Sequence, residues 1–543
     1  MLDTRDVADG SVDECLSQID MMGDDQYDTY VTDRLVDRTV PIHTPIKRNK
    51  LALFRSPTPK VAPKQKQQIT SLKNDCSLFS RLFISCQVRD GNLDEFFSHE
   101  NQANPPSLSD INGELHSCTK SDLLQCLGED VVDLPVDVEA IIIDGAALVH
   151  KLQPDFSKQV VFEHYALQFF LPYIERLLQR DNCSRVDVVW DVYLDNSLKL
   201  STRKKRGKGI RRRVEANNAI PRNSENFLRE NKNKTELFSY LASVIANANI
   251  AEDKCVVSTQ GQNVISNIPH DLTRMCPCTQ EEADSRLLLH AADCVATGVS
   301  KLMVMTVDTD VVVLCVAYVQ RLGLQELWVE IGTGKHQRYI AAHRVANELG
   351  EQKAVALPAF HAFSGCDTVS SFAGRSKKTT WDVWNAFPAV TPAFVALGDM
   401  PDSGEEHFDL LEQFVVLMYD RTSSEKHVNV ARKVLFAKKG RAMNAIPPTR
   451  GALIEHTMRT AYQAGHVWGQ ALTKTPNLPS PDSWGWHKNV DHWEPFWTSL
   501  PDAAKVQAIL KCGCKKGCTA RCKCVKAELP CTSMCNCDGE CRQ

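Results

Sequence analysis

The feature of this 543-residue sequence that most restricts its folding is a concentration of cysteines near the C-terminus. Nine of the 21 cysteines lie between Cys512 and Cys541. This segment contains no histidine and too few apolar residues for a core, so bound metal has to supply its folding free energy. Zinc is expected, because it binds four thiolates in a tetrahedron. The nine candidate ligands are Cys512, Cys514, Cys518, Cys522, Cys524, Cys531, Cys535, Cys537 and Cys541.

The cysteine count leaves more than one arrangement open. Nine thiolates complete three tetrahedral zinc sites if three of them bridge two ions each, whereas two four-cysteine sites leave one thiol over. Basic residues between the cysteines can balance the negative charge of a three-zinc cluster. A disulfide framework is the third arrangement, and a reducing compartment disfavours it. The basic residues are Lys511, Lys515, Lys516, Arg521, Lys523 and Lys526.

The rest of the sequence has the composition of an ordinary globular protein. Its net charge is −4 and its pI about 6.5, so the overall charge points neither to nucleic acid nor to a membrane. No apolar segment follows the first Met or reaches the roughly 18 residues of a membrane helix. We therefore expect a cytosolic or nuclear protein, with the nucleus preferred. The length predicts two to four folded units.

Strand-like and helical patterns alternate over residues 134–395. Short apolar runs typical of buried strands are followed by longer segments of helical periodicity. This alternation predicts an α/β fold, with a parallel sheet and helices on both faces. The expected strands are Val138–Asp144, Arg185–Asp191 and Lys301–Val307, and the expected helices are Phe162–Leu178, Glu225–Ala248 and Glu281–Ala296.

Composition divides the chain into six predicted units. Residues 1–75 are expected to be a disordered tail, because acidic and then basic, proline-rich stretches bury little apolar surface. Residues 76–133 form a globular extension before the α/β domain at 134–395, and a helical extension follows at 396–475. Residues 476–510 are a Pro- and Trp-rich linker, and 511–543 are the zinc module.

Seven carboxylates follow the predicted strands or begin the predicted helices. Parallel strands end at one edge of a sheet, so these side chains are expected to meet there. A single Asp at a strand end is more often a cap or turn residue, but here the pattern recurs along the chain. Clustered carboxylates repel each other unless cations lie among them, and Mg²⁺ or Mn²⁺ suits oxygen ligands. The seven are Asp144, Asp191, Glu282, Asp284, Asp308, Asp310 and Asp367.

Over residues 138–380 this pattern resembles the PIN-like nucleases of the flap endonuclease superfamily. The matching motifs are Asp144-Gly, Trp190-Asp191, Glu282-Ala-Asp284, Asp308-Thr-Asp310 and Gly365-Cys-Asp367. The resemblance implies that the seven acids hold two divalent ions that cleave phosphodiester bonds in DNA or RNA. Asp284 differs from the family, which usually has Glu there.

A basic run follows Asp191. Nine of the fifteen residues from Lys199 to Arg213 are Lys or Arg, and none is acidic. Such a run is either a solvated segment, a nuclear localisation sequence or a set of phosphate contacts. By its position in the resembled nucleases, the run places Lys199, Arg203 and Lys204 near the scissile phosphate.

The cysteine segment is similar to half of a tesmin-type CXC domain, whose members share nine cysteines among three zincs and bind DNA. The leading hypothesis is therefore a metal-dependent nuclease whose zinc-cluster tail anchors it to nucleic acid or chromatin. The alternative is a non-catalytic nuclear DNA- or chromatin-binding protein that uses the PIN-like fold as a scaffold. DNA is the favoured partner, and RNA is possible.

Overall fold

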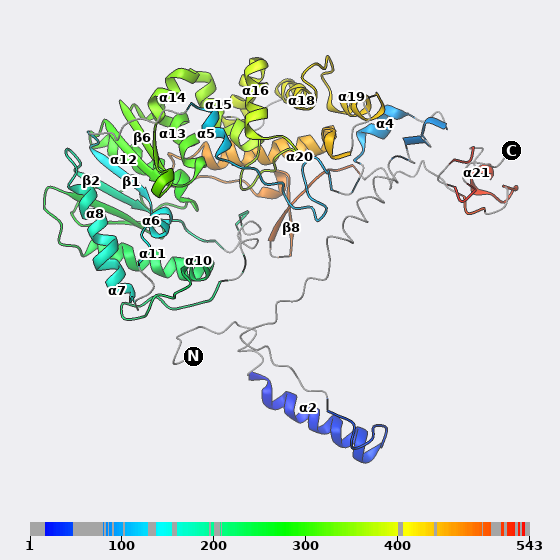
Figure 1. The fold of residues 1–543 in the computed structure, drawn as a ribbon, viewed down its shortest axis with the longest axis horizontal. Coiled ribbons are helices and arrows are strands. Elements are labelled where there is room, and N and C mark those ends of the chain that lie inside the picture. Colours follow the sequence, from blue (N-terminus) through cyan, green and yellow to red (C-terminus); the bar gives the residue numbers. More distant parts are fainter. Residues whose placement is uncertain are drawn as a thin grey trace.

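A seven-stranded sheet forms the centre of the computed structural model (Figure 1). The structure describes residues 17–46, most of 80–128, 137–154, 160–399 apart from 195–196, 200–206 and 208, 405–438, 443–500 apart from 491, and parts of 512–537. The strand order is β4-β3-β2-β1-β5-β6-β7. The five inner strands are parallel, and the edge strands β4 and β7 run antiparallel to their neighbours. The strands are β1 Ala140–Asp144, β2 Arg185–Val189, β3 Cys255–Gln260, β4 Asn263–Ser266, β5 Lys301–Thr306, β6 Glu326–Ile331 and β7 Arg338–Ala341.

Helices cover both faces of the sheet, because successive side chains of a strand point to opposite faces. In β1, Ile142 packs into one hydrophobic core with α12 (Ala283–Ala296) and α13 (Thr309–Leu322). Ile143 packs into a second core with α8 (Leu171–Leu178) and α11 (Asn231–Ala246). The predicted fold class is confirmed as an α/β fold, with a mostly parallel sheet and helices on both faces.

Two predicted helices differ in detail from the structure. Phe162–Leu178 is helical throughout, as α7 (Phe162–Tyr165), a π-helical segment (Ala166–Phe170) and α8. Glu225–Ala248 is divided into α10 (Ser224–Leu228) and α11. The side chain of Glu230 accepts a hydrogen bond from the amide of Lys232, so Glu230 begins a new helix where one continuous helix was expected.

The C-terminal helices extend one of the two cores and do not form a core of their own. Trp384, Phe394 and Trp468 belong to the same hydrophobic cluster as Ile142 of β1. Figure 1 shows these helices beside the α/β part. They are α14 (Ala342–Leu349), α15 (Glu351–Phe363), α16 (Lys377–Ala386), α17 (Thr391–Asp399), α18 (Glu405–Tyr419), α19 (Val428–Lys433) and α20 (Arg450–Ala461), which continues as a π-helical segment (Tyr462–Trp468).

Residues 481–500, within the predicted linker, are packed against the rest of the protein. They contain an antiparallel hairpin, β8 (Trp486–Asn489) and β9 (His492–Pro495). Trp484 and Trp497 are buried, and the Trp497 indole donates a hydrogen bond to the carbonyl of Gly113 at 3.2 Å. The tryptophans therefore pack this part of the predicted linker against the fold. Residues 501–511 lie outside the described part.

Two further regions precede the sheet. Within the tail predicted to be disordered, Ile19–Val31 forms helix α2, none of whose residues is buried. Residues 1–16 and 47–79 lie outside the described residues. The predicted N-terminal extension contains the short helices α4 (Leu93–Ser98) and α5 (Asp122–Cys126). Among the described helices, none has the length and apolar character needed to cross a membrane.

Candidate functional site: a carboxylate cluster

The predicted acids meet at the carboxyl ends of the central strands. Six of them, together with Lys199, line a cavity of about 650 Å³. The seventh, Asp310, lies beside them, since carboxylate oxygens of Asp284, Asp308 and Asp310 are within 4.8 Å of one another. The six lining the cavity are Asp144, Asp191, Glu282, Asp284, Asp308 and Asp367.

Asp144 ends β1 and also begins helix α6 (Gly145–Lys151). Its Oδ1 accepts a hydrogen bond from the Ala147 amide at 3.1 Å, and its Oδ2 accepts one from Thr306 of β5 at 3.3 Å. Gly145 permits a close approach, because a Cβ atom there would lie 2.2 Å from the ring of Trp190. The Asp-Gly sequence thus places the carboxylate at the strand end and lets the indole pack beneath the turn.

Asp308 and Asp310 stand at the start of α13. Asp308 caps this helix by accepting the Asp310 amide on its Oδ1 at 2.9 Å. Oδ1 of Asp310 is hydrogen-bonded to the fully buried His361, whose Nε2 lies 2.8 Å away. The helix start and this histidine fix the orientation of the pair.

Glu282 and Asp284 stand at the start of α12. Glu282 is the residue before the helix, and Asp284 lies in its first turn. The backbone between them is joined to the end of β2, since the Ala283 amide donates to Oδ1 of Asp191 at 2.9 Å. This bond brings the acids of β2 and α12 to one wall of the cavity.

Asp367 lies in the loop after α15. Gly365 has φ +116°, and a Cβ there would lie 2.8 Å from Cβ of Ser371 and 3.0 Å from Sγ of Cys118. Only glycine fits such a conformation and such a space without strain. The loop therefore turns Asp367 back toward α13, which explains the glycine of the Gly-Cys-Asp motif.

The cluster carries more buried negative charge than the protein neutralises. Burial, together with the neighbouring Asp191, raises the pKa of Asp144 to about 7. Burial likewise raises the pKa of Asp284 well above its usual range, and the nearby carboxylates of Asp308 and Glu282 add to this effect. Oε2 of Glu282 is buried and has no hydrogen-bond partner among the described residues. These are the properties of oxygen atoms arranged to receive a cation.

Two lysines face the acids. Nζ of Lys199 lies 2.7 Å from Oε1 of Glu282 and 3.5 Å from Oδ2 of Asp367, which agrees with its predicted place at the site. Nζ of Lys120 lies 2.9 Å from Oδ2 of Asp310. Sequence reasoning missed Lys120, because it lies in the N-terminal extension, 190 residues before Asp310, with no motif around it.

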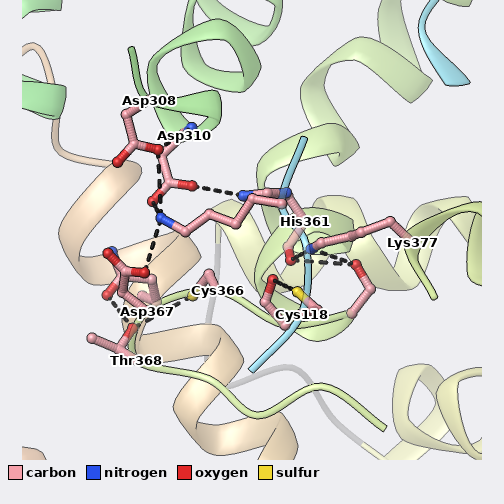
Figure 2. A network of polar contacts seen from close by, with 12 residues as sticks. Cys118, Asp308, Asp310, His361, Cys366, Asp367, Thr368 and Lys377 are labelled. Atoms are coloured by element: carbon pink, nitrogen blue, oxygen red, sulfur yellow. Dashed lines mark hydrogen bonds and ion pairs between the residues drawn. The ribbon is translucent and has the colours of Figure 1, made fainter. Parts of the chain in front are cut away.

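His361 was missed for a similar reason. It occupies a helical, largely apolar segment that reads as core, and only the fold reveals its contact with Asp310. Figure 2 shows His361 between Asp310 on one side and Lys377 on the other. Burial, with Lys377 nearby, lowers the pKa of His361 to about 4, so the ring is neutral and its Nε2–H donates to Asp310. Nζ of Lys377 donates to the His361 carbonyl at 2.5 Å and thereby holds this helix end.

The basic run makes different contacts along its length. Arg203 and Lys204, predicted to bind phosphate, lie outside the described residues. Arg211 is paired with Glu236 of α11 and donates to Asn233 at 2.9 Å, so this part of the run is anchored to the protein. Other basic side chains at the cavity, which the sequence did not single out, are His150, Arg229 and Lys234.

The C-terminal cysteines form a second group of candidate metal ligands. Sγ of Cys518 lies 3.6 Å from Sγ of Cys512 and 3.4 Å from Sγ of Cys531, and Sγ of Cys524 lies 3.6 Å from Sγ of Cys535. Tetrahedral Zn–S bonds of about 2.3 Å place sulfurs roughly 3.8 Å apart, close to these separations. Eight predicted ligands are described and form no disulfide with one another, and Cys541 lies outside the described residues. The cysteine cluster is thus confirmed as a potential metal site.

Three groups of four cysteines each have the sulfur spacing of a metal site. The first contains Cys512, Cys514, Cys518 and Cys522; the second Cys512, Cys524, Cys531 and Cys535; and the third Cys512, Cys518, Cys531 and Cys537. Cys512, Cys518 and Cys531 each occur in more than one group. Shared sulfurs of this kind are what bridging thiolates require.

Comparisons with known proteins give only distant similarity. No protein-family model matches the sequence, and no curated protein matches it. Among solved structures, the chain is similar to the 5′-exonuclease of bacteriophage T5 with bound zinc, at 12% identity and a TM-score of 0.29, covering 62% of this chain and 97% of the exonuclease. It is also similar to the catalytic core of Rad2 in complex with a DNA substrate, at 11% identity and a TM-score of 0.30, covering 62% and 92%. A likeness of this degree carries no argument, so the function has to be inferred from the site.

Proposed function

We propose that this protein is a metal-dependent nuclease that hydrolyses phosphodiester bonds in nucleic acid at the carboxylate cluster. The observation that carries the proposal is the surplus of buried carboxylates around one cavity. Among the described residues, only Lys120 and Lys199 form ion pairs with the seven acids, and the buried Oε2 of Glu282 has no hydrogen-bond partner. Such a surplus is costly unless cations bind, because buried like charges repel in a medium of low dielectric.

The donor set suits Mg²⁺ or Mn²⁺. All seven acidic ligands are oxygen donors, which these hard cations prefer, and no thiol is among the cavity-lining residues. Asp284, Asp308 and Asp310 have the spacing of an ion site, and the other four acids complete the set of candidate ligands. When bound, divalent ions supply the Lewis acidity that activates water and stabilises a leaving oxygen.

The protein's own side chains would bind and orient the substrate. Lys199, Arg229 and Lys234 lie on the cavity wall, where their positive charges would attract the phosphate backbone. Tyr193 donates to Oδ2 of Asp191 at 3.1 Å and so fixes this carboxylate toward the cavity. His361 does the same for Asp310. A preorganised set of acids of this kind needs little rearrangement when metal and phosphate arrive.

The function is tested by replacing Asp308 and Asp310 with Asn in one variant. We expect loss of Mg²⁺- or Mn²⁺-dependent cleavage on flap, single-stranded and duplex DNA and on RNA. The matched control is Asp271→Asn, which changes an exposed Asp that bonds only locally to Thr273. Cleavage that survives in the double variant at wild-type rates would show that these acids do not carry the activity.

For the cysteine tail we propose a three-zinc cluster of the CXC type that anchors the protein to nucleic acid or chromatin. Three cysteine groups and the shared Cys512, Cys518 and Cys531 support this proposal. Cys541 would be the ninth ligand and would take one of the three places that Cys512 occupies. Basic neighbours such as Arg521 and Lys523 would provide nonspecific phosphate contacts.

A second candidate function is nucleic-acid binding without catalysis. The ion pairs of Lys120 and Lys199 favour it, because they neutralise part of the cluster without metal. Equilibrium binding of labelled DNA separates the two functions. A scaffold would bind DNA equally with and without Mg²⁺ and would cleave none of the substrates, and the zinc tail would carry most of the affinity.

A further inference from the structure

Lys120 is the cation at the acidic cluster that neither the motifs nor the proposed chemistry explain. Its ammonium group has three N–H donors, and three carboxylate oxygens surround it. Nζ lies 2.9 Å from Oδ2 of Asp310, 3.0 Å from Oδ1 of Asp367 and 3.4 Å from Oδ1 of Asp308. Its side chain is 20% exposed, so these contacts are largely shielded from water.

The backbone around Lys120 is fixed to the loop that carries Asp367. The Ser371 amide donates to the His116 carbonyl at 3.0 Å, and the Ala373 amide donates to the Ser107 carbonyl at 2.8 Å. Sγ of Cys118, two residues before Lys120, donates to the Gly365 carbonyl at 3.3 Å. Lys120 is therefore held at the cluster by backbone contacts and is not a mobile surface lysine.

The position of Lys120 conflicts with a divalent ion at the same acids. Asp310 offers two oxygens, and Oδ1 is engaged by His361. Oδ2 is engaged by Lys120, although Asp284, Asp308 and Asp310 have the spacing of a metal site. An ammonium and a divalent ion that share this oxygen would repel each other at close range.

The two sides of the cluster differ in how well they are neutralised. Asp367 is paired with both lysines, because Nζ of Lys120 lies 3.0 Å from its Oδ1 and Nζ of Lys199 lies 3.5 Å from its Oδ2. Asp144 and Asp284 line the same cavity, and neither forms an ion pair with a lysine among the described residues. Negative charge without a counterion is thus concentrated on the side of Asp144 and Asp284.

We propose that Lys120 is a tethered cation that takes the place of one divalent ion, so that the site accepts a single divalent ion on the side of Asp144 and Asp284. This inference rests on the proposed function only in assuming that the cluster binds divalent ions. While Lys120 is in place, it would set the number of ions bound, and a second ion would have to displace it.

The test measures how many Mn²⁺ ions bind to the zinc-loaded full chain. Electron paramagnetic resonance detects the free Mn²⁺, and the bound Mn²⁺ is the difference from the total. We expect one Mn²⁺ per wild-type chain and two in Lys120→Met, with the second site at least tenfold tighter than any second site of the wild type. Lys120→Gln keeps hydrogen-bond donors without the charge and should also bind two ions. Lys120→Gln replaces Lys120→Met in the test if the Met variant fails to fold.

Two controls define the result. Lys120→Arg retains the cation and should bind one ion. Lys301→Met removes a lysine at the opposite end of the sheet, where Nζ lies 3.1 Å from Glu326, and should also bind one ion. Thermal unfolding without Mn²⁺ gives a second readout: Lys120→Met should melt lower than the wild type, and Mn²⁺ should raise its Tm more.

The outcomes separate this inference from the proposed function. Two ions in the wild type and in both neutral variants would overturn the role of Lys120 and leave the metal site intact. No ion in any of them would overturn both. No ion in the wild type but one or more in the neutral variants would support Lys120 as the occupying cation and count against a metal-dependent activity of the native chain.

Discussion

The imidazole of His361 and the carboxylate of Asp310 form a buried pair, with 2.8 Å between Nε2 and Oδ1. The histidine side chain is fully buried, so it acts on the site only through this carboxylate. In the Lys120→Met background, where Oδ2 of Asp310 is released to bind metal, we expect His361→Gln to lower the affinity for the second Mn²⁺ by roughly 10- to 100-fold, the usual cost of losing a group that orients a metal ligand. Mn²⁺ titration of the purified protein measures the change.

The control for this prediction is His456→Gln. His456 is equally buried, but its Nε2 donates to the backbone carbonyl of Phe363 at 2.8 Å and contacts no site acid. In the same Lys120→Met background, we expect His456→Gln to lose stability while the affinity for the second Mn²⁺ is unchanged. Equal losses of affinity in both variants would show that His361 has only a packing role.

The raised pKa of Asp144 predicts a dependence of stability on pH. Its pKa is about 7 in the folded protein and near 4 when unfolded, so between these values the folded state holds a proton that the unfolded state has lost. Without metal, the contribution of Asp144 to the free energy of unfolding therefore falls as pH rises from about 4 to 7.

Denaturant unfolding of the wild type and Asp144→Asn across that pH range isolates this contribution. His361, whose pKa is lowered to about 4, contributes the opposite slope, but it is common to both proteins and cancels in the difference. The difference should be largest near pH 7. A difference that does not change with pH would contradict a raised pKa at Asp144.

Replacing Gly365 with Ala should damage the site as well as the fold. The new Cβ would meet Ser371 and Cys118 and would hold a backbone conformation that costs about 1–3 kcal/mol. We expect a lower Tm and weaker Mn²⁺ binding, because Asp367 moves with the loop. Gly374→Ala is the matched control: its φ is also positive, at +68°, but nothing lies within 4 Å of the added Cβ. Its expected loss is about 1–2 kcal/mol of stability, with Mn²⁺ affinity retained.

Lys199→Met should weaken nucleic-acid binding by the loss of one phosphate contact. The slope of log K against log salt concentration should become shallower by about 0.7–0.9. Fluorescence anisotropy of the zinc-loaded chain with a labelled oligonucleotide, at several salt concentrations and without added Mg²⁺ or Mn²⁺, measures the slope. Lys301→Met should leave the slope unchanged. The same slope in wild type and Lys199→Met would mean that Lys199 serves only to pair with Glu282.

Zinc content should distinguish shared from unshared cysteines. The full chain is expected to hold about three zinc ions, because nine thiolates with three bridges complete three tetrahedra. Cys512→Ser removes a sulfur common to three groups and should lose more than one zinc, whereas Cys514→Ser affects one group and should lose at most one. Elemental analysis of both variants checks this. Equal zinc in both would contradict a bridging role for Cys512.

The sequence predicted the site better than it predicted the boundaries of the fold. Acids at strand ends and helix starts could be found, because parallel strands end at one edge and β1, β2 and β5 read as short apolar runs. Strands β3, β4, β6 and β7 were not predicted, and the two edge strands are only four residues long. Glu230 shows why one long helix became two: a single capping contact overrides periodicity.

No sequence pattern identifies the residues that reach the site through long-range contacts. Lys120 is an isolated lysine, and His361 is a polar residue in an apolar helix. Each gains its role only when distant segments meet. Residues 476–510 were predicted to be a linker because they are rich in Pro and Trp, and tertiary packing buries Trp484 and Trp497 within them. Composition describes a segment on its own and does not register what it packs against.

The contacts between the N-terminal extension and the Asp367 loop also set an order of assembly during synthesis. The amide of His116 donates a hydrogen bond to the side chain of Ser370, and the two residues are 254 positions apart in the sequence. The ribosome therefore makes His116 long before Ser370. Closing so long a loop is slow and follows the formation of local structure. The extension has to wait while the sheet and α15 form, and Lys120 can reach the acids only when about two thirds of the chain has emerged. The acidic cluster is therefore completed later than the sheet whose strand ends carry it.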